Sequence, residues 1–522
     1  MSTKVLTLTN IGTKGLNTDI AKCDLPAEFI TYGKNFRVFS GSINNSLPAE
    51  LWDTAPAVFN PGFLMWVQSI NSYWLVAGRN SVYAFDGADW HDISSGVYAG
   101  IGVDGELNWS GCMLGNIAIV NNPQYYPEYW SQVSAGQALQ SLNFDNVNTW
   151  EQKGFSCGII RSHKNFLFAL DLIENGEAFP NAYRWSHPSD INGLPFTWDE
   201  TDKSALAGKA QLGGDSGRII DGKSLRDSFV LYSEDGVDIL NPTLDEFVWR
   251  REELSNTVGL VNKNCIVEVK GVHFFLGDGD ILKNDGTSIT SIVHDRIRKR
   301  LTSNMNIAFY NRSYAVRNTI IKEVWFCIPE GSSEYPNVAY VYNWRDDTWA
   351  IRDIPENISF AAYGQRSEPE LTWATWEGSW VQQTGVWGSN NPSVLEETVI
   401  GVDIATSSLI SLDLIRGVSG ANVNAILERT DFPLDGHLQS NMITAVYPHM
   451  QSSSPVSIQF GGQERVNGPI SWKPAVTFTP GVDRKIDIRV TGTLMSWRIE
   501  SIGIGQFSLS GMDIHYSPAG LR

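Results

Sequence analysis

Apolar and polar residues alternate strictly along many stretches of this chain, a pattern typical of β-strands with one buried face. Near the end of the sequence, for example, Ile486, Ile488 and Val490 alternate with charged residues. Helical spacing is scarce, and we expect one short amphipathic helix, between residues 291 and 304. The pattern therefore predicts an all-β fold.

A unit of two short apolar strands joined by a Gly, Asn or Asp turn recurs through the middle of the chain, often followed by an aromatic residue. Clear copies occupy residues 73–90, 228–240, 273–282 and 323–349. The Asp-Gly and Gly-Asp pairs supply the positive φ angles that tight hairpins need, and we expect the trailing Trp to pack between neighbouring sheets. Roughly six or seven such units predict an irregular β-propeller. A string of β-sandwiches is the alternative, but these hairpins need neighbours on both faces.

The hairpin repeat gives way to other patterns towards both ends of the sequence, which indicates separate parts of the fold. Residues 1–60 form an extended, non-repeating segment that we expect to pack along another domain or subunit. Residues 61–393 carry the hairpin repeats of the propeller. Residues 394–522 have longer strands with Pro and Gly turns, as in an antiparallel β-sandwich.

Composition adds a constraint on partners. The chain of 522 residues is 42% hydrophobic and only 18% charged, so it can bury a sizeable core. Its formal net charge of −18 argues against a protein that wraps DNA by neutralising phosphates. One basic cluster, Arg296-Ile-Arg-Lys-Arg300, lies in the expected helix. It could contact DNA or an acidic neighbouring subunit, or it could simply form a solvated helix face.

A search for catalytic, cofactor-binding or metal-binding motifs assigns no residue to any of these roles. The five cysteines contain no Cys-x-x-Cys and are interpreted as reduced, packed thiols. The eight histidines show no zinc-binding spacing, and no P-loop or nucleophile elbow occurs. Gly100-Ile-Gly-Val-Asp-Gly105 is a superficial match to a dinucleotide fingerprint, because no helix is expected after it. A glycosidase carboxylate pair cannot be singled out among 57 acidic residues. We therefore expect no enzyme, and neither a signal peptide nor a membrane-spanning segment.

Two groups of residues leave a choice open. Asp278, Asp280 and Asp285 could offer oxygen ligands to Ca²⁺, although Asp-Gly pairs are also what hairpin turns require, and we favour the turn. Four tryptophans could stack on sugars, although core or interface packing is the favoured interpretation. These are Trp373, Trp376, Trp380 and Trp387.

The two ends of the chain carry a more specific signal. The first end contains Gly15-Leu-Asn-Thr-Asp-Ile20, Asp24-Leu-Pro26 and Gly33-Lys-Asn-Phe-Arg37. The other end contains Val490-Thr-Gly492, Trp497-Arg-Ile-Glu500, Phe507-Ser-Leu-Ser-Gly511 and Tyr516-Ser-Pro-Ala-Gly520. In this order, these motifs resemble the opening and closing segments of the tail nozzle, or tail hub, proteins of short-tailed bacteriophages. The middle of the chain shares with them only the pattern of propeller hairpins.

The resemblance implies a fold and a role. It implies a propeller inserted into a β-sandwich platform that the N- and C-terminal segments build together. It also implies a homo-oligomer, generally a hexameric ring, below the portal and the adaptor and beside tail fibres or tailspikes. Such a ring is assembled in the bacterial cytoplasm. In the virion it closes the DNA channel, and it conducts the genome during ejection without binding the DNA specifically. A receptor-binding or glycan-binding tail protein is the alternative, and a propeller glycosidase or depolymerase is a more distant one.

Overall fold

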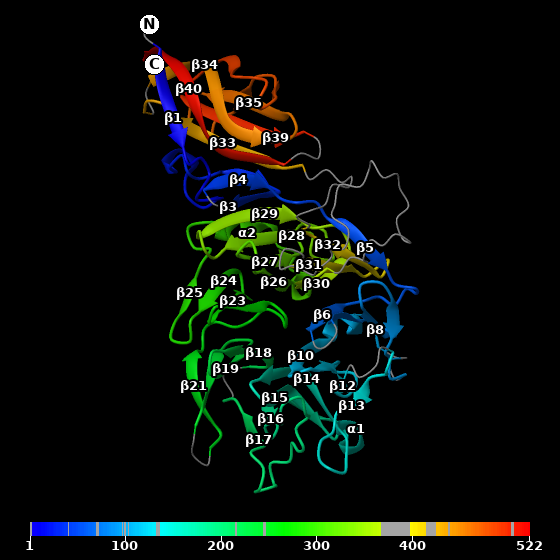
Figure 1. Ribbon diagram of the computed structural model, residues 1–522. Helices are drawn as coiled ribbons and strands as arrows, with labels where there is room; N and C mark the ends of the chain where they lie inside the picture. The colour runs from blue at the N-terminus through cyan, green and yellow to red at the C-terminus, as the bar shows by residue number, and fades with distance from the viewer. Residues whose placement is uncertain are drawn as a thin grey trace, which may run out of the picture.

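The computed structural model describes residues 3–521 except residue 40, residues 69–71, 97, 99–100, 103, 132–135, 214–216, 244–246, 367–396, 414–423, 437–438 and 503–505. Within these residues the strands form seven four-stranded antiparallel sheets and two six-stranded ones. The seven smaller sheets are the blades of a propeller, and the two larger sheets form a platform beside it (Figure 1). This confirms the expected fold, an irregular propeller inserted in a β-sandwich platform.

Each blade is a meander whose first strand is innermost. Blade 1 consists of β6 (Phe63–Gln68), β7 (Ser72–Ala77), β8 (Val82–Phe85) and β9 (Trp90–Asp92). Blade 2 consists of β10 (Ser110–Leu114), β11 (Ile117–Asn121), β12 (Glu128–Trp130) and β13 (Gln140–Ser141). Blade 3 consists of β14 (Phe155–His163), β15 (Phe166–Glu174), β16 (Glu177–Trp185) and β17 (Gly208–Gln211). Blade 4 consists of β18 (Ile219–Leu225), β19 (Ser228–Ser233), β20 (Val237–Pro242) and β21 (Trp249–Ser255).

The remaining blades complete the circle. Blade 5 consists of β22 (Ile266–Val269), β23 (Val272–Gly277), β24 (Asp280–Asn284) and β25 (Ile289–Ser291). Blade 6 consists of β26 (Tyr314–Asn318), β27 (Glu323–Ile328), β28 (Val338–Asn343) and β29 (Thr348–Asp353). Blade 7 consists of β30 (Ile358–Gln365), β31 (Glu397–Asp403), β32 (Ser408–Ser411) and β5 (Glu50–Thr54). The first strands contact one another in cyclic order, and β30 meets β6.

Aromatic residues fill the interfaces between blades. Phe168 of blade 3 stacks on Phe229 of blade 4, with ring centroids 4.1 Å apart. Trp249, on the outer strand of blade 4, packs against Phe168 and His163 of blade 3, with ring centroids 5.3 and 5.5 Å apart. Trp249 therefore packs between neighbouring sheets. The trailing tryptophans singled out by the sequence pattern also reach a neighbouring blade: Trp90 of blade 1 donates Nε1–H to Asp53 of blade 7 at 3.0 Å, and Trp349 of blade 6 donates to Ile292 O, next to blade 5, at 3.1 Å.

Blade 7 corrects the domain boundaries expected from the sequence. Its outer strand β5 lies before residue 61, and β31 and β32 lie after residue 393, so the propeller extends beyond 61–393 at both ends. The reason is topological, because a propeller closes when a strand from one end of the repeat region completes the blade at the other end. Single-sequence periodicity does not show which distant strands pair.

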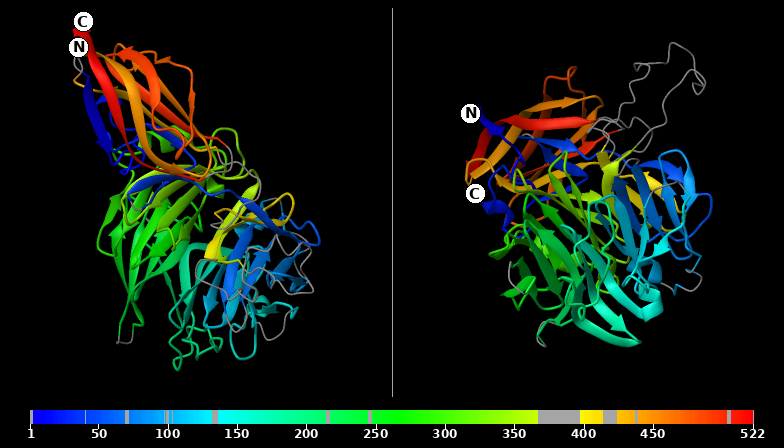
Figure 2. Two further views of the ribbon diagram at one scale, coloured as in Figure 1. Left: turned by 45° about the horizontal axis from the view of Figure 1, so that its top comes forward. Right: turned by 60° about the horizontal axis from the view of Figure 1, so that its bottom comes forward.

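The platform brings together the two ends of the chain. One sheet contains β1 (Lys4–Thr9), β3 (Phe36–Phe39), β4 (Ser42–Asn45), β40 (Phe507–Leu521), β34 (Gln439–Ser452) and β38 (Ile486–Gly492). The other contains β2 (Tyr32–Lys34), β33 (Ile426–Pro433), β39 (Leu494–Ser501), β35 (Val456–Gln463), β36 (Ser471–Trp472) and β37 (Val476–Phe478). The N- and C-terminal ends of the described chain lie side by side, away from the propeller (Figure 2).

Helices are few and short in the described residues. They are α1 (Trp150–Lys153), α2 (Arg298–Asn304) and the 3₁₀ turns η1 (Lys22–Asp24), η2 (Gly105–Asn108) and η3 (Tyr310–Arg312). The helix expected over 291–304 is thus half the predicted length. Asp295 adopts a φ of 56°, which is incompatible with an α-helix, so α2 begins only after it. None of these helices is long and apolar enough to span a membrane.

Candidate functional site

The joint between platform and propeller contains most of the N-terminal motif residues. The outer strand β29 of blade 6 has an open edge, and the N-terminal segment covers it. Leu16 N–H donates to Trp349 O at 2.8 Å, and Asn35 N–H donates to Ile351 O at 2.7 Å. Gly15 has a φ of 75°, and a Cβ there would lie 2.5 Å from Trp349 O. Only glycine therefore allows this close approach, which protects the strand edge from pairing elsewhere.

The same segment holds α2. The Asp19 carboxylate accepts hydrogen bonds from Arg298 N–H at 2.9 Å and Lys299 N–H at 3.0 Å, the first amides of the helix. The Asn17 side-chain amide donates to Asp295 O at 2.9 Å. Asp19 thus supplies from a distance the cap that Ile297, the residue before the helix, cannot provide.

The basic cluster is paired within the chain. Arg296 forms an ion pair with Asp347 at 3.1 Å and lies over the Phe29 ring, 5.5 Å from its centroid. Arg298 Nη1 lies 3.8 Å from Asp280 Oδ2, and Arg300 Nη2 lies 3.9 Å from Glu330 Oε2, so both arginines form ion pairs. The Lys299 ammonium donates to Asp19 O at 2.6 Å. The cluster therefore contributes to the joint, an arrangement that none of the three sequence-based interpretations included.

Four buried charged residues connect the platform to blades 6 and 7. Asp413, which follows β32, accepts from Arg37 Nη2 at 2.7 Å and from Arg352 Nη1 at 2.8 Å. Arg37 Nε lies 3.6 Å from Glu323 Oε1. At most 9% of each side chain is exposed. We call Arg37, Glu323, Arg352 and Asp413 the joint charge cluster. It contains two positive and two negative groups from four separate segments.

The two carboxyl groups of this cluster have pKa values shifted in opposite directions. Burial alone would raise the pKa of Asp413, but Arg37 and Arg352 outweigh burial and lower it. Burial raises the pKa of Glu323 despite the neighbouring Arg37. Asp413 is therefore the firmly ionised partner of both guanidinium groups, and it is the centre of the cluster.

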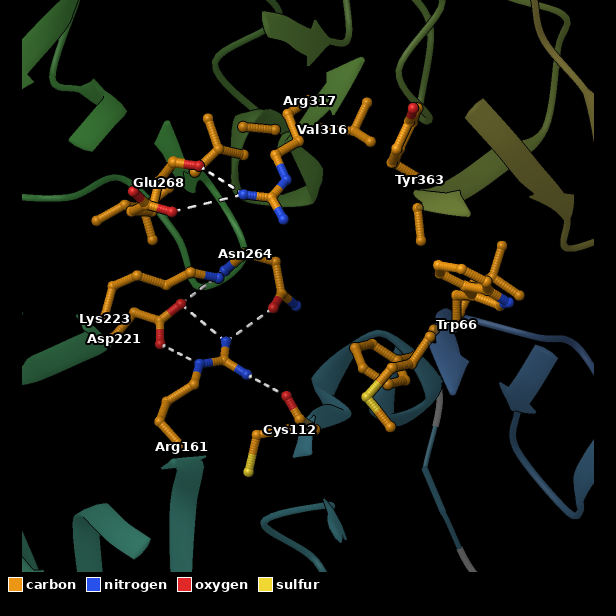
Figure 3. A pocket seen from close by; sticks show the side chains of 18 of the residues that line it. Trp66, Cys112, Arg161, Asp221, Lys223, Asn264, Glu268, Val316, Arg317 and Tyr363 are labelled. Atoms are coloured by element: carbon orange, nitrogen blue, oxygen red, sulfur yellow. Dashed lines mark hydrogen bonds and ion pairs between the residues drawn. The ribbon is translucent and has the colours of Figure 1, made fainter. Parts of the chain in front are cut away.

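A second feature is the central channel of the propeller, where all seven first strands contribute to one cavity of about 540 Å³ (Figure 3). One wall is apolar and contains Phe63, Met65 and Trp66 of β6 and Phe360 and Tyr363 of β30. The opposite wall is charged. It contains Arg161 of β14, Asp221 and Lys223 of β18, Glu268 of β22 and Arg317 of β26.

The charged wall is held by a dense set of bonds. Arg161 Nε and Nη2 donate to the two Asp221 carboxylate oxygens at 2.8 and 2.9 Å. Asn264 accepts from Arg161 Nη2 at 2.8 Å, and its own N–H donates to Asp221 Oδ2 at 3.0 Å. Arg161 and Asp221 are 9% and 1% exposed. This bidentate pair is rigid, and it neutralises the aspartate.

Lys223 differs from its neighbours. Its side chain lines the channel, and its ammonium group lies on the side of Asp221 and Asn264 (Figure 3). Within the described residues it forms no hydrogen bond or ion pair, although Asp221 and Glu268 attract it at longer range. Arg317 lies 3.5 Å from Glu268 and is nearly half exposed. Cys112 also lines the cavity, but burial raises the pKa of its thiol to about 11, so it is not a thiolate nucleophile at neutral pH.

The carboxylates weighed as Ca²⁺ ligands belong to the turns and ion pairs of blade 5. Asp280 accepts from the Ser291 hydroxyl at 2.7 Å. Asp285 caps its own turn through the N–H groups of Thr287 and Ser288, both at 2.9 Å. Asp278 lies in the turn before β24. Asp280 and Asp285 lie at opposite ends of β24, so the three carboxylates do not form a common site. Trp373, Trp376, Trp380 and Trp387 lie outside the described residues.

The cysteines and the glycine-rich stretch are also accounted for. All five thiols are free, and Cys157, Cys265 and Cys327 are buried. Gly105 begins the single turn η2 rather than a dinucleotide-binding helix. Sequence reasoning missed the joint charge cluster and the channel because their members are dispersed along the chain. Among their members, Arg37 lies in the N-terminal motif and Glu323 begins one of the hairpin repeats, but neither pattern indicated a charge cluster.

Comparisons with known proteins give only distant structural similarities. No protein-family model and no curated protein match the chain. Among solved structures, the WD40 domain of Neurospora crassa Pan2 is 7% identical over 73% of this chain and 98% of its own, with a TM-score of 0.38. An exo-β-1,3-galactanase from Phanerochaete chrysosporium is 7% identical over 90% and 100%, with a TM-score of 0.27. The extracellular domain of a hybrid two-component system from B. thetaiotaomicron is 10% identical, with a TM-score of 0.29, over 55% of this chain and 39% of its own. Similarity this low supports no inference about activity.

Proposed function

We propose that this protein is a structural component of a short-tailed bacteriophage, the nozzle or hub ring that closes the tail channel and conducts DNA during ejection. One observation carries the proposal. The two terminal stretches that resemble nozzle proteins meet in the platform, where Gly33 of β2 and Ile499 of β39 pair with Leu427 of β33 from its two sides. Their motif residues are thus used together, although they are separated by nearly the whole chain.

The joint supports a mechanical role. Buried apolar residues form one continuous cluster from the platform sheets through Leu16 and Ile30 into blades 5 and 6. The joint charge cluster adds directional contacts across the same boundary. Contacts of this kind resist displacement of the propeller from its platform, which is the property that a subunit of a load-bearing ring needs.

Charge supports a conduit for DNA. Each chain carries a formal charge of −18, and a hexamer multiplies that charge sixfold. An acidic lumen repels phosphates, so a translocating duplex would not adhere to the wall. In this proposal the ring contacts the adaptor above it and the tail fibres or tailspikes beside it, DNA passes without specific binding, and the chain has no catalytic role.

Electron microscopy of the purified full-length protein tests the proposal. We expect rings, six-fold by preference, with an open or plugged lumen along the axis. A chain that stays monomeric at high concentration and in the presence of portal and adaptor rings would contradict it. Binding on a glycan array by a trimer would instead indicate a receptor-binding tail protein. Cleavage of host polysaccharide would indicate a depolymerase.

A further inference from the structure

The propeller channel has a local charge opposite to that of the whole protein. Arg161, Lys223 and Arg317 carry three positive charges against two negative charges on Asp221 and Glu268. Asp221 is fully engaged by Arg161, and Glu268 faces Arg317. The surplus positive charge therefore resides on Lys223, in a chain whose net charge is −18.

Leaving this ammonium without a partner has a cost. A half-buried cation without hydrogen bonds forfeits solvation that a bound anion would replace. The arrangement around Lys223 is also fixed in advance. Arg161, Asp221 and Asn264 hold one another through four hydrogen bonds, so little reorganisation is needed on binding.

We propose that the propeller channel binds a small organic anion, with its carboxylate or phosphate group on Lys223 and its less polar body against the wall formed by Trp66 and Phe360. The two walls face each other across the cavity (Figure 3). A volume of about 540 Å³ is within the range of small-molecule sites. An apolar surface opposite one unpaired charge selects molecules that are anionic at one end and flat or apolar at the other.

The backbone of the channel adds polar contacts. Among the described strands, each first strand pairs on one side only, so its other edge faces the channel or an adjacent blade. Arg161 Nη1 already binds one such group, Gly111 O, at 3.0 Å. Peptide groups along these edges can hydrogen-bond hydroxyls or amides on the body of the ligand. A sugar acid or a sugar phosphate therefore fits the site as well as an aromatic acid does.

Binding should depend on pH in one direction. Burial and the nearby Arg161 lower the pKa of Lys223 to about 8. Asp221, Glu268 and Arg317 are the other charged groups facing it, and Tyr363 and Cys112 are neutral because burial raises the pKa of both. The ammonium form is present below pH 8 and is lost above it. Anion affinity should therefore decrease between pH 7 and pH 9.

Titration calorimetry on the full-length protein tests this inference. The probes are benzoate, D-glucuronate and glucose 6-phosphate, with benzamide and glucose as neutral counterparts. We expect at least one anion to bind and its neutral counterpart to bind at least about tenfold more weakly, as the loss of a charge-assisted contact implies. The identity of the anion that binds shows whether the site prefers a carboxylate or a phosphate group, and an aromatic or a sugar body.

Three variants localise the binding. Lys223→Met should weaken it at least about tenfold, whereas Glu268→Gln should strengthen it a few-fold by removing a competing negative charge. Lys203→Met removes an exposed lysine outside the channel and serves as the matched control. Circular dichroism checks folding, and Lys223→Gln replaces the methionine variant if the latter fails to fold.

The outcomes are distinct. If no anion binds to the wild-type protein at millimolar concentrations, or if the Lys223 variants bind as the wild type does, the inference is wrong. A Glu268→Gln variant that binds more weakly would also contradict it. These measurements need no ring, so their failure leaves the proposed nozzle role unaffected, and a monomeric chain leaves the anion site unaffected.

Discussion

At the scale of single residues, buried charge is the most consequential feature of this protein. Removing one partner of a buried ionic cluster leaves the others without compensation, which costs more than the pair itself contributes. Asp413 is the partner of both Arg37 and Arg352, and a hydrogen bond from the Asn318 amide at 3.2 Å completes its environment. The cluster should therefore be sensitive to the loss of this one carboxylate.

We predict that Asp413→Asn lowers the free energy of unfolding by about 3–5 kcal/mol, because two buried guanidinium groups then share only Glu323. Urea denaturation followed by circular dichroism measures the change. Asp487→Asn is the matched control, because Asp487 forms an exposed ion pair with Lys485 and its loss should be hardly measurable. Equal effects of the two variants would show that the cluster does not stabilise the joint.

A buried histidine gives a second residue-scale prediction. His273 lies between blades 4 and 5, where Nε2 donates to Ser224 O at 2.8 Å and Nδ1 accepts from the Tyr232 hydroxyl at 2.9 Å. The tautomer follows from these partners, because a carbonyl oxygen can only accept. Burial lowers the pKa of His273 to about 4. The folded state therefore favours neutral imidazole.

The lowered pKa of His273 determines how stability depends on pH. Between pH 6.5 and pH 4 the unfolded chain binds a proton that the folded chain does not, so stability is complete above pH 6.5 and decreases as the pH falls. We predict that His273→Gln flattens this dependence, measured as the difference in urea midpoint between pH 7 and pH 5. His294→Gln changes an exposed histidine and should behave as the wild type does. A parallel pH dependence in all three proteins would refute the assignment.

At the scale of elements, the joint illustrates how one segment completes another. Helix α2 begins without a capping side chain of its own, and β29 has an open edge. The extended N-terminal segment satisfies both through Asp19 and Leu16. An extended segment of this kind has no core of its own, so its conformation depends on these contacts.

We predict that Asp19→Ala destabilises the joint by roughly 1 kcal/mol, the usual value of a helix cap. Hydrogen exchange should increase first in residues 3–30 and in α2, because local opening does not require the propeller to unfold. Asp24→Ala, an exposed neighbour, is the control and should leave exchange unchanged. Increased exchange spread evenly over all blades would indicate a global effect instead.

At the scale of the whole molecule, closure of the propeller depends on β5. This strand pairs with β32, and Thr54 lies opposite Ser408 with their hydroxyl oxygens 2.9 Å apart. The contact joins the chain before the first blade to the chain in the last, so it encloses the whole propeller. Constraining it removes conformational freedom from the unfolded state.

We predict that the double variant Thr54→Cys/Ser408→Cys forms a disulfide that stabilises the protein by about 2–4 kcal/mol. Comparing the thermal midpoint of the oxidised and reduced double variant measures this, and each single variant controls for the substitution alone. Failure to form the disulfide, despite free access of oxidant, would contradict the pairing of β5 with β32.

The sequence by itself determined what local periodicity controls. Alternating residues specify strands, the Asp-Gly turns specify hairpins, and repeated hairpins with two apolar faces require a circular arrangement. The terminal motifs also indicated that both ends share one platform. The position of a helix could be predicted but not its length, because the backbone at Asp295 depends on the segment that packs beside it.

Only the tertiary structure decided which distant residues meet. The strand that completes blade 7, the carboxylates that pair with Arg296, Arg298 and Arg300, and the unpaired state of Lys223 all depend on contacts between residues far apart in the sequence. Burial and electrostatic pairing are properties of positions in space, and no pattern of neighbours along the chain encodes them directly. For this reason the fold class was predictable from the sequence, whereas the joint charge cluster and the channel were not.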